Sequence, residues 1–531
     1  MVKIMKKRNM FFLLTGVVFL LAACSKSQTQ PGTEENLKPT IITAAPTKMP
    51  EEEPTATPVP TLTSTPVPTP TPTLSPTPTL TPTPEPTATP TPEPTMMLVP
   101  ESFSVSEKIP AISIITENGQ PILSKEEYVN CSVTLYNTEA KYALQEEEAG
   151  IRVRGNSSSY YWDVEAWKTK EVPYRIKFEE KTNLLGLNDG AECKSWVLLR
   201  TDDGLIRDEI AFRMGSVLLG ENNYSSDSQL VHLYVNEEFK GLFLLCEQSQ
   251  VNKHRVDVYE PKKDETGTKI GYLLEIDNYA NINEHPCFRM EYENAEMTDI
   301  EGVTDTFQRV HYTIKSDITS QEQVDFISSY TINLFKLVYE ACEKGNYLTF
   351  DENYNLVPAS FDNAKDTVDA VLNLDSVVGS YILEEIMDDQ DCGAGSFFMC
   401  IDFSEESKYP KLTFTCPWDY NWTCMHEPQG EYYAAAFDTP EFEEKYGDRS
   451  HPWFILLMKQ DWFVELVKEK WTQVRQDGLL EACIQGEKAY IDEYRTDINK
   501  KWSYAADAGY VILGWIERRI AWLDEEWLNK E

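Results

Sequence analysis

Three oxygen-bearing side chains, Asp391, Ser396 and Asp419, flank a pair of strand-like segments. The segments at residues 396–401 and 411–416 are rich in β-branched and aromatic residues, and the polar turn between them predicts a β-hairpin. Because a hairpin brings the start of its first strand beside the end of its second, we expect the three side chains to converge. Carboxylate and hydroxyl oxygens suit a hard cation such as Mg²⁺. The alternative is that both aspartates only cap turns.

Cationic residues form a second group of candidates, in the first half of the chain. Residues 173–178 alternate between apolar and cationic side chains, which predicts a strand that turns Arg175 and Lys177 away from the core. Such a pair can meet nucleotide phosphates, with lysine as a point charge and arginine as a fork. A solvent-exposed polar face is the alternative. Arg154 leads from another predicted strand into a turn of small residues, although the sequence GxxxxGK[ST] is absent.

The elements that must position these residues differ between the two halves of the chain. The first half is rich in short β-prone runs, and a helix is expected at residues 205–219 with Asp203 as its cap. The second half is mainly helical around the hairpin. The clearest strand-like runs lie at 111–115, 132–136 and 151–154, and residues 231–235 and 241–245 predict a hairpin with a polar turn between them. The clearest late helices begin at 461 and cover 512–527.

The N-terminus predicts export and a lipid anchor. A positively charged start and an apolar run of about a dozen residues, too short to span a bilayer, read as a signal peptide over residues 1–24. The run ends in small residues before Cys24, which resembles a lipobox with Cys24 as the lipidated residue. Two acyl chains on one cysteine anchor a protein stably. Residues 25–100 are dominated by Thr and Pro and predict a disordered, extended tether.

Composition narrows the partners of the remaining folded part. The formal net charge of −39 argues against nucleic acid and anionic lipid surfaces, so we expect membrane association through the lipid anchor alone. We interpret the ten cysteines after Cys24 mainly as buried thiols, and the sequence allows one or two disulfides without fixing their partners. The six histidines follow no metal-binding pattern.

Several segments, in order and spacing, resemble the CotH kinase family, the spore-coat type of atypical protein kinase with surface lipoprotein members. The resemblance extends over residues 110–528. The matching segments are residues 152–158, 173–178, 183–187, 194–199, 206–208, 233–236, 241–248, 271–277, 384–391 and 417–420.

The resemblance implies an α+β, bilobal, atypical kinase-like fold. Its strand-rich N-lobe would cover residues 101–260, and its mainly helical C-lobe, which carries the hairpin, residues 261–531. It also implies binding of ATP with Mg²⁺ or Mn²⁺ and transfer of phosphate to a serine of an exported or wall-associated protein substrate. The protein would then act outside the cytoplasm, lipid-anchored to the bacterial cell membrane.

The resemblance also assigns roles to the residues of the hairpin. Asp391 matches the catalytic aspartate, which orients the attacking hydroxyl, and Asp419 matches the metal-binding aspartate. Ser396 stands five residues after Asp391, where protein kinases place an asparagine that binds metal. A hydroxyl is a weaker ligand, which puts the second metal position in doubt.

For the nucleotide, Lys177 is the best candidate for the phosphate-binding lysine. Arg175, Arg154 and Arg207 are expected beside it, and Glu247 is expected near the hinge between the lobes.

Two readings of the whole protein remain open at the level of sequence. One is an active surface kinase. The other is a non-catalytic kinase-like scaffold or adhesin that binds cell-wall glycan or partner proteins. The export signal and Ser396 favour the second reading, whereas the presence of both aspartates favours the first. A glycosidase that uses two carboxylates ranks below both.

Overall fold

The computed structural model describes residues 108–200, 206–220, 223–277, 279–280, 285–290, 311–389, 392–435 and 451–529. The predicted lipidation site Cys24, the tether, the helix cap Asp203 and the catalytic candidate Asp391 lie outside the described residues.

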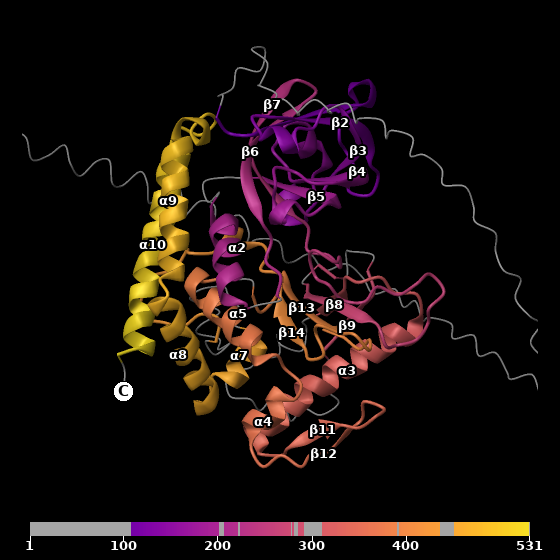
Figure 1. Cartoon of the computed structure of the whole chain (residues 1–531), viewed down its shortest axis with the longest axis vertical. Coiled ribbons are helices and arrows are strands. Elements are labelled where there is room, and N and C mark those ends of the chain that lie inside the picture. Colours follow the sequence, from indigo (N-terminus) through magenta and orange to yellow (C-terminus); the bar gives the residue numbers. More distant parts are fainter. Residues whose placement is uncertain are drawn as a thin grey trace, which may run out of the picture. The chain divides into compact units, whose positions relative to one another are not determined.

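Seven strands in the first half of the chain form a closed barrel with the order β1-β2-β3-β4-β5-β7-β6 (Figure 1). Neighbouring strands are antiparallel except β1 and β6, which run parallel and close the barrel with Ala111 opposite His232. The strands are β1 (Ala111–Thr116), β2 (Val129–Tyr136), β3 (Glu147–Val153), β4 (Tyr174–Thr182), β5 (Cys193–Arg200), β6 (Ser228–Val235) and β7 (Glu238–Glu247).

The alternation of β4 is as predicted. Tyr174, Ile176 and Phe178 are buried in the barrel interior, while Arg175 and Lys177 lie on its outer face. The outer face of β5 and β7 is apolar, because Val197 and Cys246 belong to the large core of the second half. The barrel therefore has its own core, and part of its outer wall packs on the rest of the protein.

A five-stranded sheet with the order β14-β13-β8-β10-β9 follows the barrel. Its strands are β8 (Gly271–Ile276), β9 (Cys287–Arg289), β10 (His311–Ile314), β13 (Phe397–Asp402) and β14 (Thr413–Thr415), and a separate hairpin joins β11 (Leu348–Phe350) to β12 (Leu356–Pro358). The predicted hairpin is confirmed as the antiparallel pair β13–β14. Its second strand is shorter than expected, because Leu412 bridges to Leu372 instead and Cys416 takes a φ of 53°.

Helices dominate the rest of the second half (Figure 1). The helix expected at residues 205–219 is confirmed as α2, and the two late helices are confirmed as α8 and α10. The helices are α2 (Arg207–Leu218), α3 (Gln321–Tyr339), α4 (Ala364–Asp369), α5 (Leu374–Met387), α7 (Pro452–Leu457), α8 (Asp461–Gln476), α9 (Leu479–Ile498) and α10 (Ala505–Trp527). Among the described helices, none combines the length and apolar character needed to cross a membrane.

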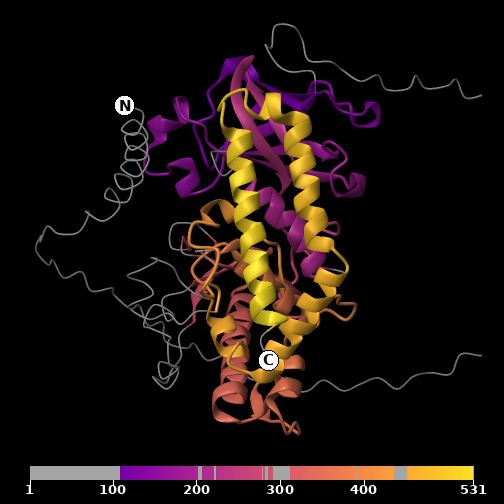
Figure 2. The ribbon, with the colours of Figure 1, turned by 90° about the vertical axis from the view of Figure 1, so that its left-hand side faces the viewer.

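The last two helices, α9 and α10, lie side by side and reach back to the barrel (Figure 2). The carbonyl of Asp497, at the end of α9, lies 3.1 Å from Nε2 of His232 in β6. The Asp497 carboxylate also accepts a hydrogen bond of 3.3 Å from the backbone N–H of Ile109, just before β1. The end of α9 is thus bonded to β6 and to the residue that shortly precedes β1.

Ten cysteines lie in the described residues. Seven are buried and three are half-buried, in agreement with the interpretation that they are mainly buried thiols.

Candidate active site

Two of the three predicted hairpin side chains meet. Ser396 directly precedes β13, and Asp419 follows β14 by four residues. The Ser396 hydroxyl donates a hydrogen bond of 3.2 Å to Oδ2 of Asp419. Both residues have left-handed backbones, with φ of 56° and 71°. Such conformations are strained for residues other than glycine and cluster at functional sites.

Arg154 is the cation that faces Asp419 across the site. Its guanidinium also lies over the ring of Trp418, at 5.3 Å from the ring centroid. Burial raises the pKa of the Asp419 carboxyl, and the charge of Arg154 and the Ser396 hydroxyl offset part of that rise. The Asn421 amide donates to the same carboxylate. Asp419 is therefore held in a polar pocket of low dielectric.

Two supports fix the residue that follows Asp419. Asp208, near the start of α2, accepts a hydrogen bond of 2.8 Å from the backbone N–H of Tyr420. The Tyr420 hydroxyl donates a bond of 2.8 Å to Glu384 in α5. Burial raises the pKa of Glu384 to about 7, which keeps it largely protonated under mildly acidic conditions. Sequence reasoning missed both supports. Asp208 stood in a matched segment, but no local pattern linked it to Tyr420.

The segment that leads toward residue 391 is fixed at the end of α5. Asp388 takes a left-handed backbone with φ of 53°. Its carboxylate accepts bonds from the backbone N–H groups of Met425 and His426, at 3.3 and 3.2 Å, and lies 3.1 Å from Nδ1 of His426. The chain is thus anchored three residues before Asp391.

A group of cations covers the outer face of β3 and β4 near Arg154. Arg152 and Arg175 are direct partners across these strands, and the charge of Arg152 contributes to the lowered pKa of both Arg154 and Arg175. Burial is the largest cause of the lowered pKa of Arg175 and of Arg154. Arg175 donates a bond of 3.2 Å to the Ser195 hydroxyl, and its buried Nε has no hydrogen-bond partner.

These cations lack carboxylate partners. Within the described residues, none of Arg152, Arg154 and Arg175 forms an ion pair, although the net charge of the chain is −39. By contrast, Arg255 and Arg519 are fully buried, and each binds a glutamate. Arginines that are half-buried and make no direct ion pair with described residues have donors that can bind an anion such as phosphate.

The structure places Lys177 differently from Arg154. Lys177 is exposed on β4 and makes no ion pair with any described residue. Its side chain shares the outer face of the strand with Arg175, so its role as the phosphate-binding lysine stays a prediction. Arg207 begins α2, and its buried Nε has no hydrogen-bond partner among the described atoms.

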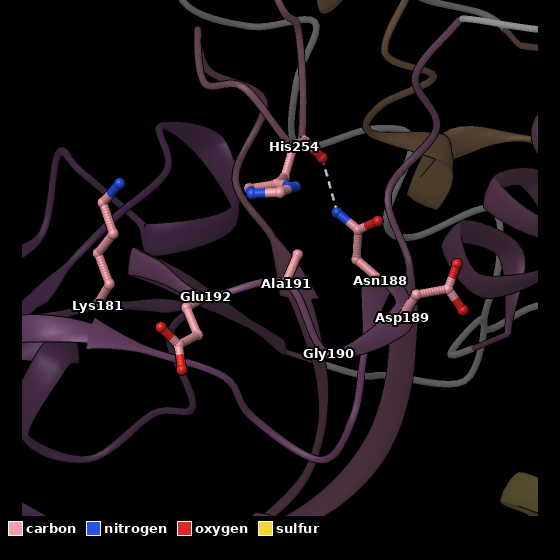
Figure 3. Close-up of a pocket in the computed structure, with 7 residues that line it drawn as sticks. All are labelled: Lys181, Asn188, Asp189, Gly190, Ala191, Glu192 and His254. Atoms are coloured by element: carbon pink, nitrogen blue, oxygen red, sulfur yellow. Dashed lines mark hydrogen bonds between the residues drawn. The ribbon is translucent and has the colours of Figure 1, made fainter.

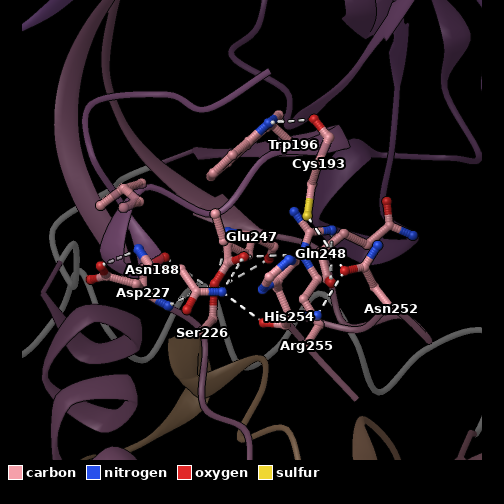
Figure 4. Close-up of polar contacts among 12 residues, drawn as sticks. Asn188, Cys193, Trp196, Ser226, Asp227, Glu247, Gln248, Asn252, His254 and Arg255 are labelled. Carbon is pink, nitrogen blue, oxygen red and sulfur yellow. Dashed lines mark hydrogen bonds and ion pairs between the residues drawn. The ribbon is translucent and has the colours of Figure 1, made fainter. Parts of the chain in front are cut away.

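Glu247 is buried at the end of β7 in an ion pair (Figure 4). It accepts a bond of 3.0 Å from Nε of Arg255, another of 3.0 Å from Asn188, and one of 3.2 Å from Tyr224. Arg255 donates in turn to the backbone carbonyl of Ser195, at 2.8 Å. These bonds give Glu247 a structural role in joining β5 and β7 to the β4–β5 turn. Its predicted contact with a nucleotide stays a prediction.

A pocket of about 630 Å³ opens beside this ion pair (Figure 3). It is lined by Lys181, the turn 188–192 and His254, and the Asn188 amide donates a bond of 2.7 Å to the His254 carbonyl across it. Small-molecule pockets are mostly apolar with a few polar groups. This lining is largely polar and of mixed charge, and we assign no ligand to it.

The donor set at the hairpin fits a magnesium ion. No group of three or more His, Cys, Asp and Glu side chains in the described parts of the chain is arranged for a metal. Mg²⁺, however, commonly binds one or two protein carboxylates and completes its shell with waters and substrate phosphates. The paired oxygens of Ser396 and Asp419 meet that requirement, with the cations of β3 and β4 opposite them.

Comparison with known protein families gives one match. A family model described as CotH kinase protein matches residues 151–523 of the 531, well over half of the chain. The match includes the whole site, from Arg152 to Asp419. Among curated proteins, no significant match was found.

Proposed function

Because the chain belongs to the CotH kinase family, we propose that it transfers a phosphoryl group from ATP, with Mg²⁺ or Mn²⁺, to a serine of a protein substrate. The proposed arrangement is bilobal, with the barrel as the N-lobe and the sheet and helices after it as the C-lobe.

One observation carries the proposal: the half-buried Arg154 faces a carboxylate–hydroxyl pair, and Arg152 and Arg175 add cationic charge beside Arg154. The arginines match the charge of a triphosphate, and the oxygen pair matches a divalent cation that travels with it. Phosphoryl transfer is catalysed by positioning of the reactants and by stabilisation of their charge. A site with fixed cations on one side and a metal-binding oxygen pair on the other can provide both.

In the proposed reaction, the serine oxygen of the substrate bonds to the γ-phosphorus while the bond from that phosphorus to the β–γ bridging oxygen breaks. ADP leaves with the bridging oxygen, and the serine proton passes to Asp391 or to water. Asp391 orients the hydroxyl, and Asp419 with Ser396 holds the metal. Arg154 and Arg175 bind phosphate oxygens, with Lys177 farther along β4. When bound, the cation would neutralise part of the negative charge of the phosphates.

We further propose that the protein works outside the cytoplasm, lipid-anchored to the bacterial cell membrane through Cys24. Its substrates would be exported or wall-associated proteins. This part rests on the signal-like N-terminus and the Pro/Thr-rich segment alone.

The test uses the purified full chain. Thermal stability is measured with ATP alone, with Mg²⁺ or Mn²⁺ alone, and with both, and transfer from labelled ATP to protein is followed in parallel. We expect a rise in melting temperature that needs both components, together with transfer that Asp419→Asn nearly abolishes. The absence of any nucleotide-dependent shift, or full transfer by Asp419→Asn, would overturn the proposal.

A non-catalytic scaffold is the second candidate. It is favoured by the bonds of Asp419, whose carboxylate already receives the Ser396 hydroxyl and the Asn421 amide and faces Arg154. In that case, the affinity for nucleotide or for a cell-wall partner would change neither with added metal nor in Asp419→Asn.

A further inference from the structure

A group of aromatic side chains and cations lies in the turn that follows Arg154. We call Tyr160, Tyr161 and Trp162, together with Lys125, Lys170 and Arg200, the aromatic rim. Nζ of Lys170 lies 4.2 Å and the guanidinium of Arg200 lies 4.9 Å from the ring centroid of Tyr160. Nζ of Lys125 lies 6.0 Å from that of Tyr161. Trp162 contacts both tyrosines edge-on and remains 64% exposed.

Acidic residues neighbour the cations of the aromatic rim in the chain, and the charge of Glu126 offsets part of the lowered pKa of Lys125. Within the described residues, Lys125, Lys170 and Arg200 form no ion pair with a carboxylate. Arg200 donates to the Tyr160 hydroxyl at 2.5 Å, and Lys125 donates to Asn156 at 2.8 Å. These three cations therefore offer charge that can attract acidic groups, in a chain whose net charge is −39.

The aromatic rim borders the candidate active site. Tyr161 packs edge-on against Tyr279, with ring centroids 5.9 Å apart. Tyr279 lies three residues after Ile276, which is the partner of Phe397 at the start of β13, and Ser396 immediately precedes Phe397. On the other side, Lys125 lies close enough to Arg154 for the arginine charge to lower its pKa, although burial is the larger cause. The aromatic rim therefore extends from the cationic site toward solvent.

The cations near Asp419 and those of the aromatic rim differ in burial, which indicates different roles. Arg154 is half-buried and faces Asp419, where phosphates would bind, whereas Lys170 and Trp162 are exposed at the outer edge. A ligand bound to the aromatic rim would therefore lie at the outer edge of the site and extend inward toward the phosphates.

We propose that the aromatic rim binds the protein substrate and selects an acidic segment, with carboxylates next to the phosphorylated serine and an apolar or aromatic side chain against Trp162. This inference rests on the proposed function, because only a protein kinase has a protein substrate to select. Binding of a peptide to the aromatic rim can nevertheless occur without phosphoryl transfer. Carboxylates of the segment would bind Lys170 and Arg200, and the exposed indole would supply apolar contact.

The experiment uses the full chain and two synthetic peptides that differ only in the residues around a central serine, glutamates in one and lysines in the other. Fluorescence anisotropy measures binding of labelled versions in which alanine replaces the serine, so that no transfer is needed. Transfer to the serine peptides gives KM for peptide and for ATP. The variants are the double change Lys170→Gln with Arg200→Gln, and Trp162→Ala. Lys365→Gln, at an exposed lysine of α4, is the charge control.

We expect the glutamate peptide to bind at least tenfold more tightly than the lysine peptide. The double variant and Trp162→Ala should each weaken binding about five- to tenfold and leave KM for ATP within twofold, while Lys365→Gln has no effect. Equal binding of the two peptides, or a rise in KM for ATP with unchanged peptide binding, would overturn the inference. If the glutamate peptide binds as expected but is not phosphorylated, the proposed function fails and the binding surface stands.

Discussion

Replacing Asp208 tests whether α2 positions the candidate metal-binding aspartate. Asp208 lies 212 residues before Tyr420 in the chain and accepts its backbone N–H at 2.8 Å. Tyr420 is 1% exposed, so water cannot readily replace a lost partner. The neighbouring Asp419 keeps its left-handed backbone while that N–H remains bonded. We therefore expect Asp208 to act on transfer through Asp419.

The size of the effect follows from the type of bond. A hydrogen bond to a charged group contributes about 1.5–3 kcal/mol and a neutral one about 0.5–1.5 kcal/mol. Asp208→Asn keeps an acceptor and loses about 1 kcal/mol, which lowers kcat/KM about fivefold if the whole loss falls on the transition state. Asp208→Ala leaves a buried N–H unpaired at a cost of about 1–3 kcal/mol, which corresponds to a loss of about 5- to 150-fold.

The assay is steady-state transfer from labelled ATP at several Mg²⁺ concentrations, with urea unfolding in parallel. Asp461→Asn is the matched control, because Asp461 also lies in the first turn of a helix, α8, and is exposed. Both asparagine variants lose a favourable helix-end charge of about 0.3–1 kcal/mol. Only the Asp208 series should lose transfer, in the order Asp, Asn, Ala. Equal activity across that series, or an equal loss in Asp461→Asn, would refute the argument.

Three further predictions follow from the same region. Arg154→Gln removes the cation opposite Asp419 and should weaken binding of ATP with Mg²⁺ at least tenfold by calorimetry, and unchanged affinity would contradict the site. Burial raises the pKa of Glu384 from 4.5 to about 7, so the folded chain holds a proton there that the unfolded chain releases. This contribution to stability is full below pH 4.5 and is lost as the pH rises through 7. Urea unfolding at pH 5 and pH 8 should show a fall of about 1–3 kcal/mol that is smaller in Glu384→Gln. A Cβ at Gly379 of α5 would lie 2.1 Å from the Leu218 carbonyl of α2, so Gly379→Ala should lower the free energy of unfolding by about 2 kcal/mol or more, whereas Gly514→Ala in α10, which meets nothing closer than 3.8 Å, should not.

Local patterns were sufficient to predict the hairpin and one face of the barrel. The alternation around Arg175 and Lys177 has the period of a strand, and the strand is β4 with that orientation. The turn between the two strand-like segments predicted that Ser396 and Asp419 would meet, and they do. Both predictions depend on geometry that is set within a few residues or within one hairpin.

The contacts that decide the electrostatics of the site join distant segments, and the sequence could not rank them. Arg154 and Lys177 both belong to the outer barrel face, but alternation does not tell which of them reaches Asp419, because that depends on how the barrel packs on β8 and β13. Glu247 looked available near a hinge, yet Arg255, eight residues later, binds its carboxylate. No helical or strand period relates those two positions.

The bond between Ile109 and Asp497 has a consequence for folding. These residues are 388 positions apart, and β1 also pairs with β6 across more than a hundred residues. Contacts of such separation close late, since each must overcome the entropy of a long loop. The bond between α9 and the residue before β1 therefore forms only after α9 has left the ribosome. A chain that stops before Leu479 would lack this bond, although β1 would still pair with β2 and β6.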